Sequence, residues 1–474
     1  MELPRLLQGP WPGSPLRSVH SGWGRLALHL PAHGLGRGLA PATRRLLQGP
    51  PGSWDWPELP AFGGPLIEEG AVAEVQCRLA AQMGAERCWL GVNGASGLLQ
   101  AALLAMTRPG DRVLLPRNLH RSLLHACLLG GLRPVLMRLP FDRASGLWMP
   151  PTLRDLEPVL AAASPLAAAV LVHPTYQGLA ADLRPLVAAL QARGLPVLVD
   201  EAHGAHFAAA PRRLPESALA CGADLVVHSL HKSAGGLGQT AVLWQQGPRV
   251  QPATVERSLL WLQTSSPSAL LLASGAAAIE RLQQPAGRAA LQRSLERAER
   301  ARAQLQQRGW PLLANADPLR LVLITARLGC SGLAADGWLM ERGVVGELPE
   351  PGCLTFCLGL TPPRVLGRRL HRAWSAMAAA IGSSAPLPPF EPPPLPLVCE
   401  PELELGQAAR AASEPVALEA SAGRWAAAMI CPYPPGIPLL CPGERIDPAR
   451  RDWLLEQRRL WPGQIADTVQ VVRP

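Results

Sequence analysis

Residues 196–232 read PVLVDEAHGAHFAAAPRRLPESALACGADLVVHSLHK and contain two apolar runs that end at polar residues. Asp200 follows the first run directly, and the second run ends at Ser229, three residues before Lys232. Short runs rich in Val and Leu are typical of buried strands. In open parallel sheets, ligands bind beyond the carboxyl ends of the strands. We therefore expect Asp200 and Lys232 to face one crevice.

The same pattern continues upstream of this segment. Apolar runs RVLLP, RPVLMRL and AAAVLVHP precede it, and the later runs recur at intervals of about 25 to 30 residues. Segments with helical spacing, such as LLQAALLAMT, HRSLLHACLLGG and DLRPLVAALQARG, separate the runs. Strands that alternate with helices predict an α/β fold with a mainly parallel sheet covered on both faces.

Lys232 is the single lysine of the chain, against 44 arginines (45 Lys+Arg minus one). An average charged composition would give roughly 30 lysines. A GC-rich genome accounts for the arginines, and chance survival of one surface lysine is the simplest alternative. Arginine replaces lysine as a surface cation, but its guanidinium stays protonated and cannot attack a carbonyl. Lys232 is therefore a candidate Schiff-base lysine.

A glycine-rich turn, NGASG (93–97), lies between the predicted strand CWLGV and a predicted helix. Ala95 and Ser96 could offer backbone N–H groups and a hydroxyl to a phosphate at the helix N-terminus. Taken singly, such a turn and a strand-end Asp200 are more often structural. Together with Lys232 they suit pyridoxal phosphate (PLP): the amine forms a Schiff base, and the carboxylate keeps the pyridine nitrogen protonated.

Several other classes of protein are disfavoured. The net charge is +9 and the pI about 9.4, but the arginines are dispersed singly and in pairs, so no nucleic-acid partner is expected. DEAH (200–203) also names a helicase box, yet no GxxxxGK[ST] phosphate loop exists. The ten cysteines include no CxxC pair, which predicts free thiols and no metal site. No apolar run reaches about 18 residues and no secretory leader is evident, so we expect a soluble cytoplasmic protein.

Changes in composition suggest how the chain is divided. SSAPLPPFEPPPLPL (383–397) contains seven prolines and predicts a semi-rigid linker. The predicted parts are an irregular N-terminal arm (1–60), a PLP-binding large domain (61–285), a smaller α/β domain (286–382), the linker (383–397) and a C-terminal domain (398–474).

The motifs also carry a family resemblance. LHLPAHGLGRG (28–38), VNGASG, PRNLHRS, HPTYQGLAADL, VDEAHGAHF, HSLHKS, LQTSSPS and YPPGIPLLCPGE occur in this order between about His29 and Glu444. In these motifs the chain resembles the PLP-dependent ornithine/lysine/arginine decarboxylases of fold type I, the fold of aspartate aminotransferase. The resemblance implies a large domain with a mainly parallel sheet, a smaller domain and a decarboxylase-type C-terminal domain.

The resemblance also implies roles for individual residues. Lys232 would carry the cofactor, Asp200 would pair with its pyridinium nitrogen, and His203 would lie near the ring, positioning it or handling protons. The remaining implied contacts are ring stacking by His120, phosphate binding by Ser96, Ser229 and His231, contact with a neighbouring subunit's phosphate by Thr264 and Ser265, and binding of the substrate's distal cation by Glu347 or Glu444.

The chain departs from the family pattern at several positions. Ala32 replaces a glycine, Leu230 and His173 stand where hydroxyl residues are common, and Gln177 replaces an aromatic residue. The chain also begins almost directly at the catalytic region, without the N-terminal wing domain of longer family members. We therefore expect a homodimer or tetramer with sites at the subunit interface, rather than a decamer.

The expected reaction is α-decarboxylation of a basic amino acid, giving CO2 and agmatine or a diamine. Arginine is favoured as substrate, then lysine or ornithine. An aminotransferase or another lyase shares the fold and the Lys–Asp pair, so fold analogy alone does not exclude it. A catalytically silent PLP-binding relative is a further alternative. The HPTYQG, DEAHGAHF and YPPGIPLLCPGE segments favour the decarboxylase, and the intact Lys232–Asp200–His120 set argues against a silent protein.

Overall fold

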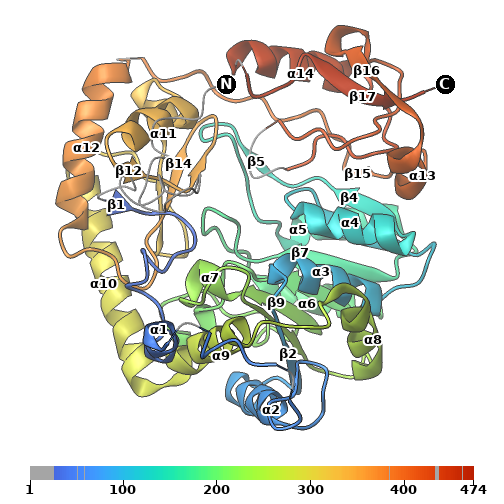
Figure 1. Ribbon diagram of the computed structural model, residues 1–474. Coiled ribbons are helices and arrows are strands. Elements are labelled where there is room, and N and C mark those ends of the chain that lie inside the picture. Colours follow the sequence, from blue (N-terminus) through green and yellow to red (C-terminus); the bar gives the residue numbers. More distant parts are fainter. Residues whose placement is uncertain are drawn as a thin grey trace.

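The computed structural model describes residues 26–50, 52–57, 59–383, 385–432, 437–461 and 463–473. Residues 1–25 of the predicted arm and residues 433–436 of the YPPGIPLLCPGE motif lie outside these ranges. The described chain has a central sheet with helices on both faces, a smaller sheet bordered by long helices, and a C-terminal segment above the sheet edge in the view of Figure 1.

The central sheet has eight strands, in the order β15-β4-β3-β7-β8-β9-β10-β2. Neighbouring strands from β4 to β9 pair in parallel, whereas β10 is antiparallel to both of its neighbours. Their bounds are β15 (Val398–Cys399), β4 (Arg133–Met137), β3 (Arg112–Pro116), β7 (Ala168–Val172), β8 (Val197–Asp200), β9 (Leu225–Ser229), β10 (Ala241–Gln245) and β2 (Arg87–Gly91).

Helices bury both faces of this sheet. Successive side chains of a strand point to opposite faces, so each strand contributes to two hydrophobic clusters. Leu225 and Val227 of β9 pack in one hydrophobic cluster, and Val226 packs in the other. The first cluster draws on α3 (Gly94–Ala105), α4 (Arg121–Gly130) and α8 (Pro252–Leu262). The second draws on α2 (Ala71–Met83), α5 (Leu153–Ala163), α6 (Leu183–Gln191) and α9 (Ala269–Gln283). The predicted α/β fold is confirmed.

Two strands of the sheet were not anticipated: β15, which pairs antiparallel with β4 at one edge, and β10. The segment AVLWQ forms β10, which returns antiparallel beside β9, so that residues 230–240 make a tight connection carrying Lys232. An apolar run predicts a buried strand but not its direction, which depends on the length of the connection and on the partner strand.

The smaller sheet has the order β11-β14-β13 and is antiparallel. It consists of β11 (Arg320–Leu323), β14 (Leu354–Cys357) and β13 (Leu348–Pro349), with α10 (Pro285–Gln306), α11 (Gly332–Glu341) and α12 (Leu366–Ile381) around it. The predicted strand within LRLVLITA is β11, and the predicted charged helix is α10 (Figure 1).

The described part of the N-terminal arm is more regular than expected. Strand β1 (Leu26–Ala27) pairs in parallel with β12 (Val344–Val345). This pairing attaches the arm to the region that contains the smaller sheet. Helix α1 (Pro41–Gln48) begins at a proline and packs against α9. Proline suits the first turn of a helix because its missing N–H would have no partner there.

The described residues of the proline-rich linker form no helix or strand, yet they are packed against the rest of the chain. Phe390 and Leu395 are buried, and Arg138 donates backbone and side-chain hydrogen bonds to the carbonyls of Leu397 and Leu395. The linker is therefore a fixed strap rather than a free spacer.

Beyond the strap, the chain forms a small module with its own core. It comprises β15, α13 (Leu405–Arg410), α14 (Pro448–Leu460) and the antiparallel pair of β16 (Ser413–Ala417) and β17 (Thr468–Val472). Its core includes Leu418, Leu440 and Leu454, and β15 pairs with β4 at the edge of the central sheet. Within the described residues, none of the helices has the length and apolarity needed to span a bilayer.

Candidate active site

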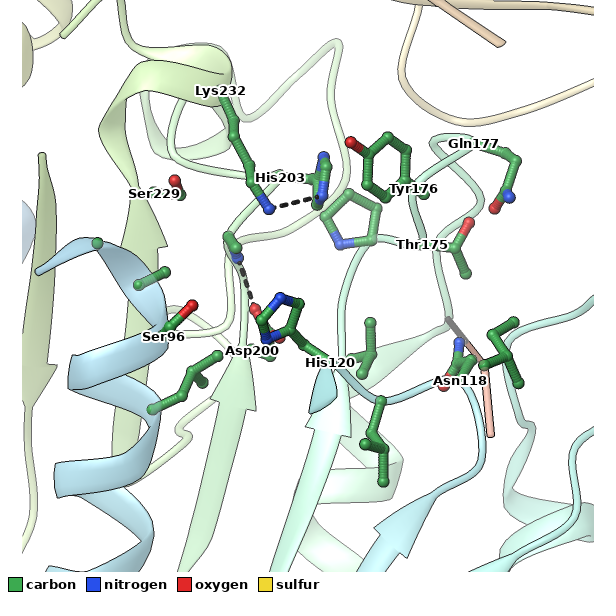
Figure 2. Close-up of a pocket in the computed structure, with 18 of the residues that line it drawn as sticks. Ser96, Asn118, His120, Thr175, Tyr176, Gln177, Asp200, His203, Ser229 and Lys232 are labelled. Atoms are coloured by element: carbon green, nitrogen blue, oxygen red, sulfur yellow. Dashed lines mark hydrogen bonds between the residues drawn. The ribbon is translucent and has the colours of Figure 1, made fainter. Parts of the chain in front are cut away.

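A cavity with about 220 Å³ of water-accessible space lies at the carboxyl ends of the parallel strands (Figure 2). It is lined by residues from strand ends, from the start of α3 and from the loop before α4. The structure brings together there eight of the residues singled out in the sequence: Ala95, Ser96, His120, Asp200, His203, Ser229, His231 and Lys232.

Lys232 reaches the cavity from a short helix, α7 (Leu230–Ser233), that follows β9 directly. The N–H of Leu230 donates to the Thr240 carbonyl at 2.9 Å, which closes the β9–β10 connection. Leu230 itself is fully buried in the core, so this departure from the family pattern does not face the cavity. Gly235 has a φ of +77°, and a Cβ there would lie 2.3 Å from the Gly38 carbonyl oxygen. The lysine loop is therefore pressed against the N-terminal arm at a position that requires glycine.

The protonation state of Lys232 follows from its neighbours. His203 Nε2 lies 3.1 Å from Lys232 Nζ, and His203 Nδ1 accepts a hydrogen bond from Arg320 Nη2 at 3.2 Å. Burial is the main cause that lowers the pKa of His203 well below its usual value, and the charge of Arg320 acts in the same direction, so the imidazole is neutral. Because guanidinium only donates, the imidazole proton must be on Nε2.

That Nε2–H points to Nζ, so Nζ accepts it through the lone pair of a neutral amine. Burial lowers the pKa of Lys232, while Asp200 acts in the opposite direction. The hydrogen-bond geometry indicates the unprotonated amine, and the lowered pKa acts in the same direction; this is the nucleophilic form.

His120 presents its ring to the cavity from the N-cap of α4. Its Nδ1 accepts a hydrogen bond from the Ser122 backbone N–H at 3.2 Å, which fixes the ring orientation. Burial lowers the pKa of His120, although Asp200 opposes this shift. Asp200, at the end of β8, accepts a hydrogen bond from the Ala202 N–H at 3.1 Å through Oδ1. The His120 ring, which follows β3, and the Asp200 carboxylate, at the end of β8, thus line the same cavity at the carboxyl edge of the sheet.

One side of the cavity suits an anion. Helix α3 begins at Gly94, whose N–H donates to the Gln239 carbonyl at 2.8 Å, and the Asn93 side chain donates to the Leu262 carbonyl instead of capping the helix. The N–H groups of Ala95 and Ser96, next in the first turn, are therefore available to a ligand. Ser229 Oγ lies 3.2 Å from His231 Nδ1, and burial lowers the pKa of His231 to about 4. Figure 2 shows Ser96 and Ser229 on one side of the Lys232 terminus and Gln177 on the opposite side.

Two predicted residues lie elsewhere in this chain. Thr264 and Ser265 are exposed on the turn between α8 and α9 and are not among the residues that line the Lys232 cavity. Their implied role concerns the cavity of a neighbouring subunit, and it stays a prediction. His173 is buried with its Nε2 3.1 Å from the Glu216 carbonyl, outside the cavity lining.

The two glutamates singled out for substrate binding have partners of their own. Glu347 accepts hydrogen bonds from the Leu30 N–H at 2.6 Å and from the Tyr176 hydroxyl. Tyr176 lines the cavity and Glu347 does not, so the Tyr176 side chain lies between Glu347 and the cavity.

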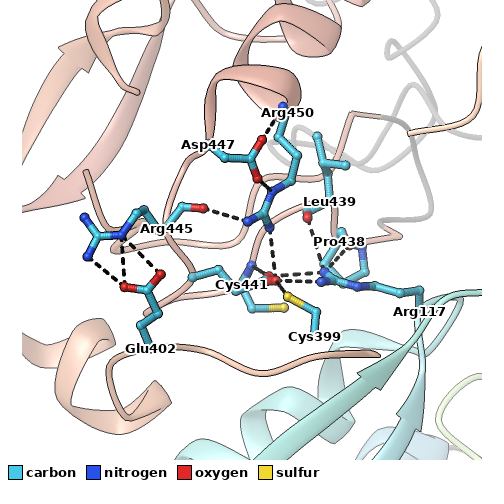
Figure 3. Close-up of polar contacts among 10 residues, drawn as sticks. Arg117, Cys399, Glu402, Pro438, Leu439, Cys441, Arg445, Asp447 and Arg450 are labelled. Carbon is cyan, nitrogen blue, oxygen red and sulfur yellow. Dashed lines mark hydrogen bonds and ion pairs between the residues drawn. The ribbon is translucent and has the colours of Figure 1, made fainter. Parts of the chain in front are cut away.

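Glu444 lies in a separate network between Arg117, which follows β3, and the C-terminal module. Figure 3 shows the Arg117 and Arg450 side chains of this network. Its carboxylate pairs with Arg117 at 2.6 Å and with Arg450 at 3.1 Å, and it accepts the Cys441 N–H at 2.6 Å. Burial alone would raise the pKa of Glu444, but the arginines hold it below its usual value. The structure does not bring Glu444 to the Lys232 cavity.

The sequence analysis assigned no role to three residues at the site, Tyr176, Arg320 and Glu350. Tyr176 packs its ring 4.3 Å from the His203 ring, and burial followed by the charge of Glu347 raises its pKa, so the phenol stays protonated. Arg320 sets the His203 tautomer from β11. Glu350 lines the cavity beside Gln177. The HPTYQG motif pointed to Tyr176, whereas Arg320 and Glu350 come from the smaller sheet and carried no local signal.

This architecture, with a lysine and a carboxylate at adjacent strand ends of a mainly parallel sheet, is fold type I of the PLP-dependent enzymes. Two solved structures share it. Lysine decarboxylase A from Pseudomonas aeruginosa superposes with a TM-score of 0.72 at 21% identity, covering 95% of this chain and 78% of that one. The constitutive lysine decarboxylase of Escherichia coli gives 0.71 at 21% identity, covering 87% and 73%.

Sequence comparison narrows the class to a family. The profile of the Orn/Lys/Arg decarboxylase major domain matches residues 53–331, and that of the C-terminal domain matches residues 394–460. An arginine decarboxylase of Halalkalibacterium halodurans is 30% identical over 461 residues, covering 93% of this chain and 92% of the relative. The chain belongs to the Orn/Lys/Arg decarboxylase family.

Proposed function

We propose that this protein is a PLP-dependent decarboxylase of a basic amino acid, with arginine as the favoured substrate. The observation that carries the proposal is a buried Lys232 amine 3.1 Å from His203 Nε2, in a cavity that also contains Asp200. Arginine is placed first because the arginine decarboxylase relative is 30% identical, whereas a lysine decarboxylase from Pseudomonas aeruginosa is 25% identical.

The chemistry of the cavity residues fits PLP. Lys232 would bind it covalently, Asp200 would pair with its pyridine nitrogen, and the ring of His120 would cover one face. The open N–H groups at the start of α3, with Ser96, Ser229 and His231, would hold its phosphate. When bound, PLP supplies an electron sink for the pair left at Cα when a carboxylate departs as CO2.

The chain's own residues orient the substrate and move protons. Burial lowers the pKa of Lys232, which favours the amine form that would hold the cofactor covalently. His203 Nε2 and Lys232 Nζ, 3.1 Å apart, form a short path for returning a proton to Cα. Arg320 holds His203 in the tautomer that keeps Nε2–H directed at Lys232. The protonated Tyr176 packs against His203 and limits the movement of its ring.

The test is a product assay with the PLP-loaded enzyme. Arginine, lysine and ornithine are supplied separately, and CO2 is measured together with agmatine, cadaverine and putrescine. We expect CO2 and one amine in equal amounts, with arginine giving the largest kcat/KM. A requirement for a keto-acid acceptor would indicate an aminotransferase instead. No product from any of the three at saturation would contradict the proposal and indicate a silent PLP-binding relative.

We further propose that the protein is a homodimer or tetramer in which Thr264 and Ser265 reach the partner's phosphate site. Their exposure in this chain supports the proposal. Light scattering of the purified protein measures the assembly. A Thr264→Ala/Ser265→Ala variant should bind PLP more weakly in the assembled enzyme, and an unchanged PLP affinity would contradict the assignment.

A further inference from the structure

Glu350 is a buried carboxylate on the wall of the Lys232 cavity. It follows β13 directly and is 7% exposed. Its backbone N–H donates to the Cys353 carbonyl at 2.9 Å, which fixes the turn toward β14. Glu350, Trp148 and Ile437 line both this cavity and a second, adjoining one, so the carboxylate stands where the two spaces meet.

This carboxylate has no counterion among the described residues. Gln177 Nε2 donates to its Oε2 at 2.8 Å, and the Cys353 thiol lies 3.5 Å from the same oxygen. No arginine, lysine or histidine of the described chain comes within ion-pairing distance of it. Burial raises the pKa of Glu350 to about 7. A buried acid without a cationic partner is costly to maintain, and a bound cation would remove that cost.

The position of Gln177 shows which end of the cavity is involved. Gln177 lies in the loop after β7 and contacts Glu350 directly. In Figure 2 it is on the side of Lys232 opposite to Ser96 and Ser229, which suit a phosphate. A substrate whose α-amine is at Lys232 therefore has the Gln177–Glu350 end of the cavity available for its side chain.

The other candidate acids are already engaged. Glu444 is neutralised by Arg117 and Arg450 in the contact with the C-terminal module. Glu347 accepts two hydrogen bonds and lies behind Tyr176. Within the described residues, Glu350 is the glutamate that both lines the cavity and lacks a cation.

We propose that Glu350, positioned by Gln177, binds the distal cationic group of the substrate and sets the preference for a basic over a neutral amino acid. The inference rests on the proposed decarboxylase function, and it names a specificity-determining residue for it. A guanidinium or ammonium would donate charge-assisted hydrogen bonds to the carboxylate. Gln177 acts through Glu350 by holding Oε2 in place.

The direct test uses ligand binding to the PLP-loaded enzyme rather than turnover. Glu350→Gln keeps the shape of the side chain and removes its charge. Calorimetry would compare agmatine with its neutral ureido isostere, N-carbamoylputrescine, in the wild type and the variant. We expect agmatine to bind about 10- to 100-fold more weakly to the variant, because a charged hydrogen-bond partner is lost. Binding of the neutral isostere should change by less than about threefold.

Two further variants sharpen the result. Glu341→Gln removes an exposed carboxylate on α11 and should leave both affinities unchanged. Gln177→Leu should lower the agmatine-to-isostere selectivity by a smaller factor than Glu350→Gln. A general loss of stability would weaken the binding of both ligands and leave this selectivity unchanged. Circular dichroism and thermal unfolding would confirm that each variant is folded.

The outcomes separate this inference from the proposed function. If the wild type releases CO2 from arginine and Glu350→Gln binds agmatine as tightly as the wild type, the assignment of Glu350 is overturned. The same holds if Glu347→Gln, and not Glu350→Gln, loses the selectivity. If the wild type releases no CO2 from any basic amino acid, the proposed function fails.

Discussion

Glu444 and Glu350 are both buried glutamates, and they differ in what surrounds the charge. Glu444 is 1% exposed and pairs with two arginines, Arg117 and Arg450. Glu350 is 7% exposed, and its side chain has only the Gln177 amide and the Cys353 thiol as partners among the described residues. The arginines keep the pKa of Glu444 below its usual value, whereas burial raises that of Glu350 to about 7.

The comparison separates two uses of a buried charge. Where the chain supplies its own counterions, the carboxylate joins parts of the fold, here β3 and the C-terminal module (Figure 3). Where the chain supplies none and the carboxylate lines a cavity, the charge is available to a ligand. Removing the Glu444 carboxylate should therefore affect the stability of the fold, and removing the Glu350 carboxylate should affect ligand binding.

The largest effect is expected at Lys232, in the cavity region. Lys232→Arg keeps a cation but cannot form an imine, so decarboxylation should fall by more than about 10³-fold, as when a nucleophile is removed. Borohydride reduction followed by peptide mass analysis should tether PLP to Lys232 in the wild type and to no residue in the variant. Turnover near the wild-type rate would refute the central assignment.

The second-largest effect is expected at Glu444, whose charge is compensated by two arginines. Glu444→Ala leaves Arg117 and Arg450 buried without their partner, and it should destabilise the fold by about 3–5 kcal/mol. Urea unfolding measures this loss. In the molecules that remain folded, agmatine affinity should stay close to that of the wild type. An unchanged unfolding midpoint would show that the network does not hold the C-terminal module in place.

Glu350→Gln should have the opposite effect on stability when no substrate is present. The pKa of Glu350 is raised from 4.5 to about 7 on folding, so the wild type loses stability as pH rises between these values. The uncharged variant avoids this loss. We expect its thermal midpoint to exceed that of the wild type at pH 8, with the difference shrinking as pH falls toward 5. A midpoint below the wild type at pH 8 would contradict the view that this charge is uncompensated.

The smallest effect is expected at an exposed pair in the same C-terminal region. Arg445 contacts Glu402 at 2.7 Å, but both side chains are exposed, at 41% and 50% (Figure 3). Water and salt screen such pairs, so Arg445→Gln should leave the thermal midpoint unchanged within error. A loss as large as that of Glu444→Ala would mean that burial does not decide which ion pairs stabilise this protein.

Local patterns were enough to predict much of the site. The runs ending at Asp200 and Ser229 predicted adjacent strands, and β8 and β9 are neighbours in parallel. The turn before α3 and the sole lysine could also be identified from the sequence, because the residues that mark them are visible without knowledge of distant contacts. The division into parts at 61–285, 286–382 and 398–474 stays a prediction, although the packed strap shows that the linker is not free.

The sequence by itself determined the strand ends, the single amine and the glycine-rich turn before α3. Only the tertiary structure decided which distant groups act on them. Arg320 and Glu350 come from the antiparallel sheet, and their distance along the chain from Lys232 leaves no periodic signal. The charge of Glu444 is likewise stabilised by two arginines from different parts of the fold. Apolar periodicity records which face of an element is buried, but the charge of a buried group is set by whichever side chains the fold brings within a few ångströms.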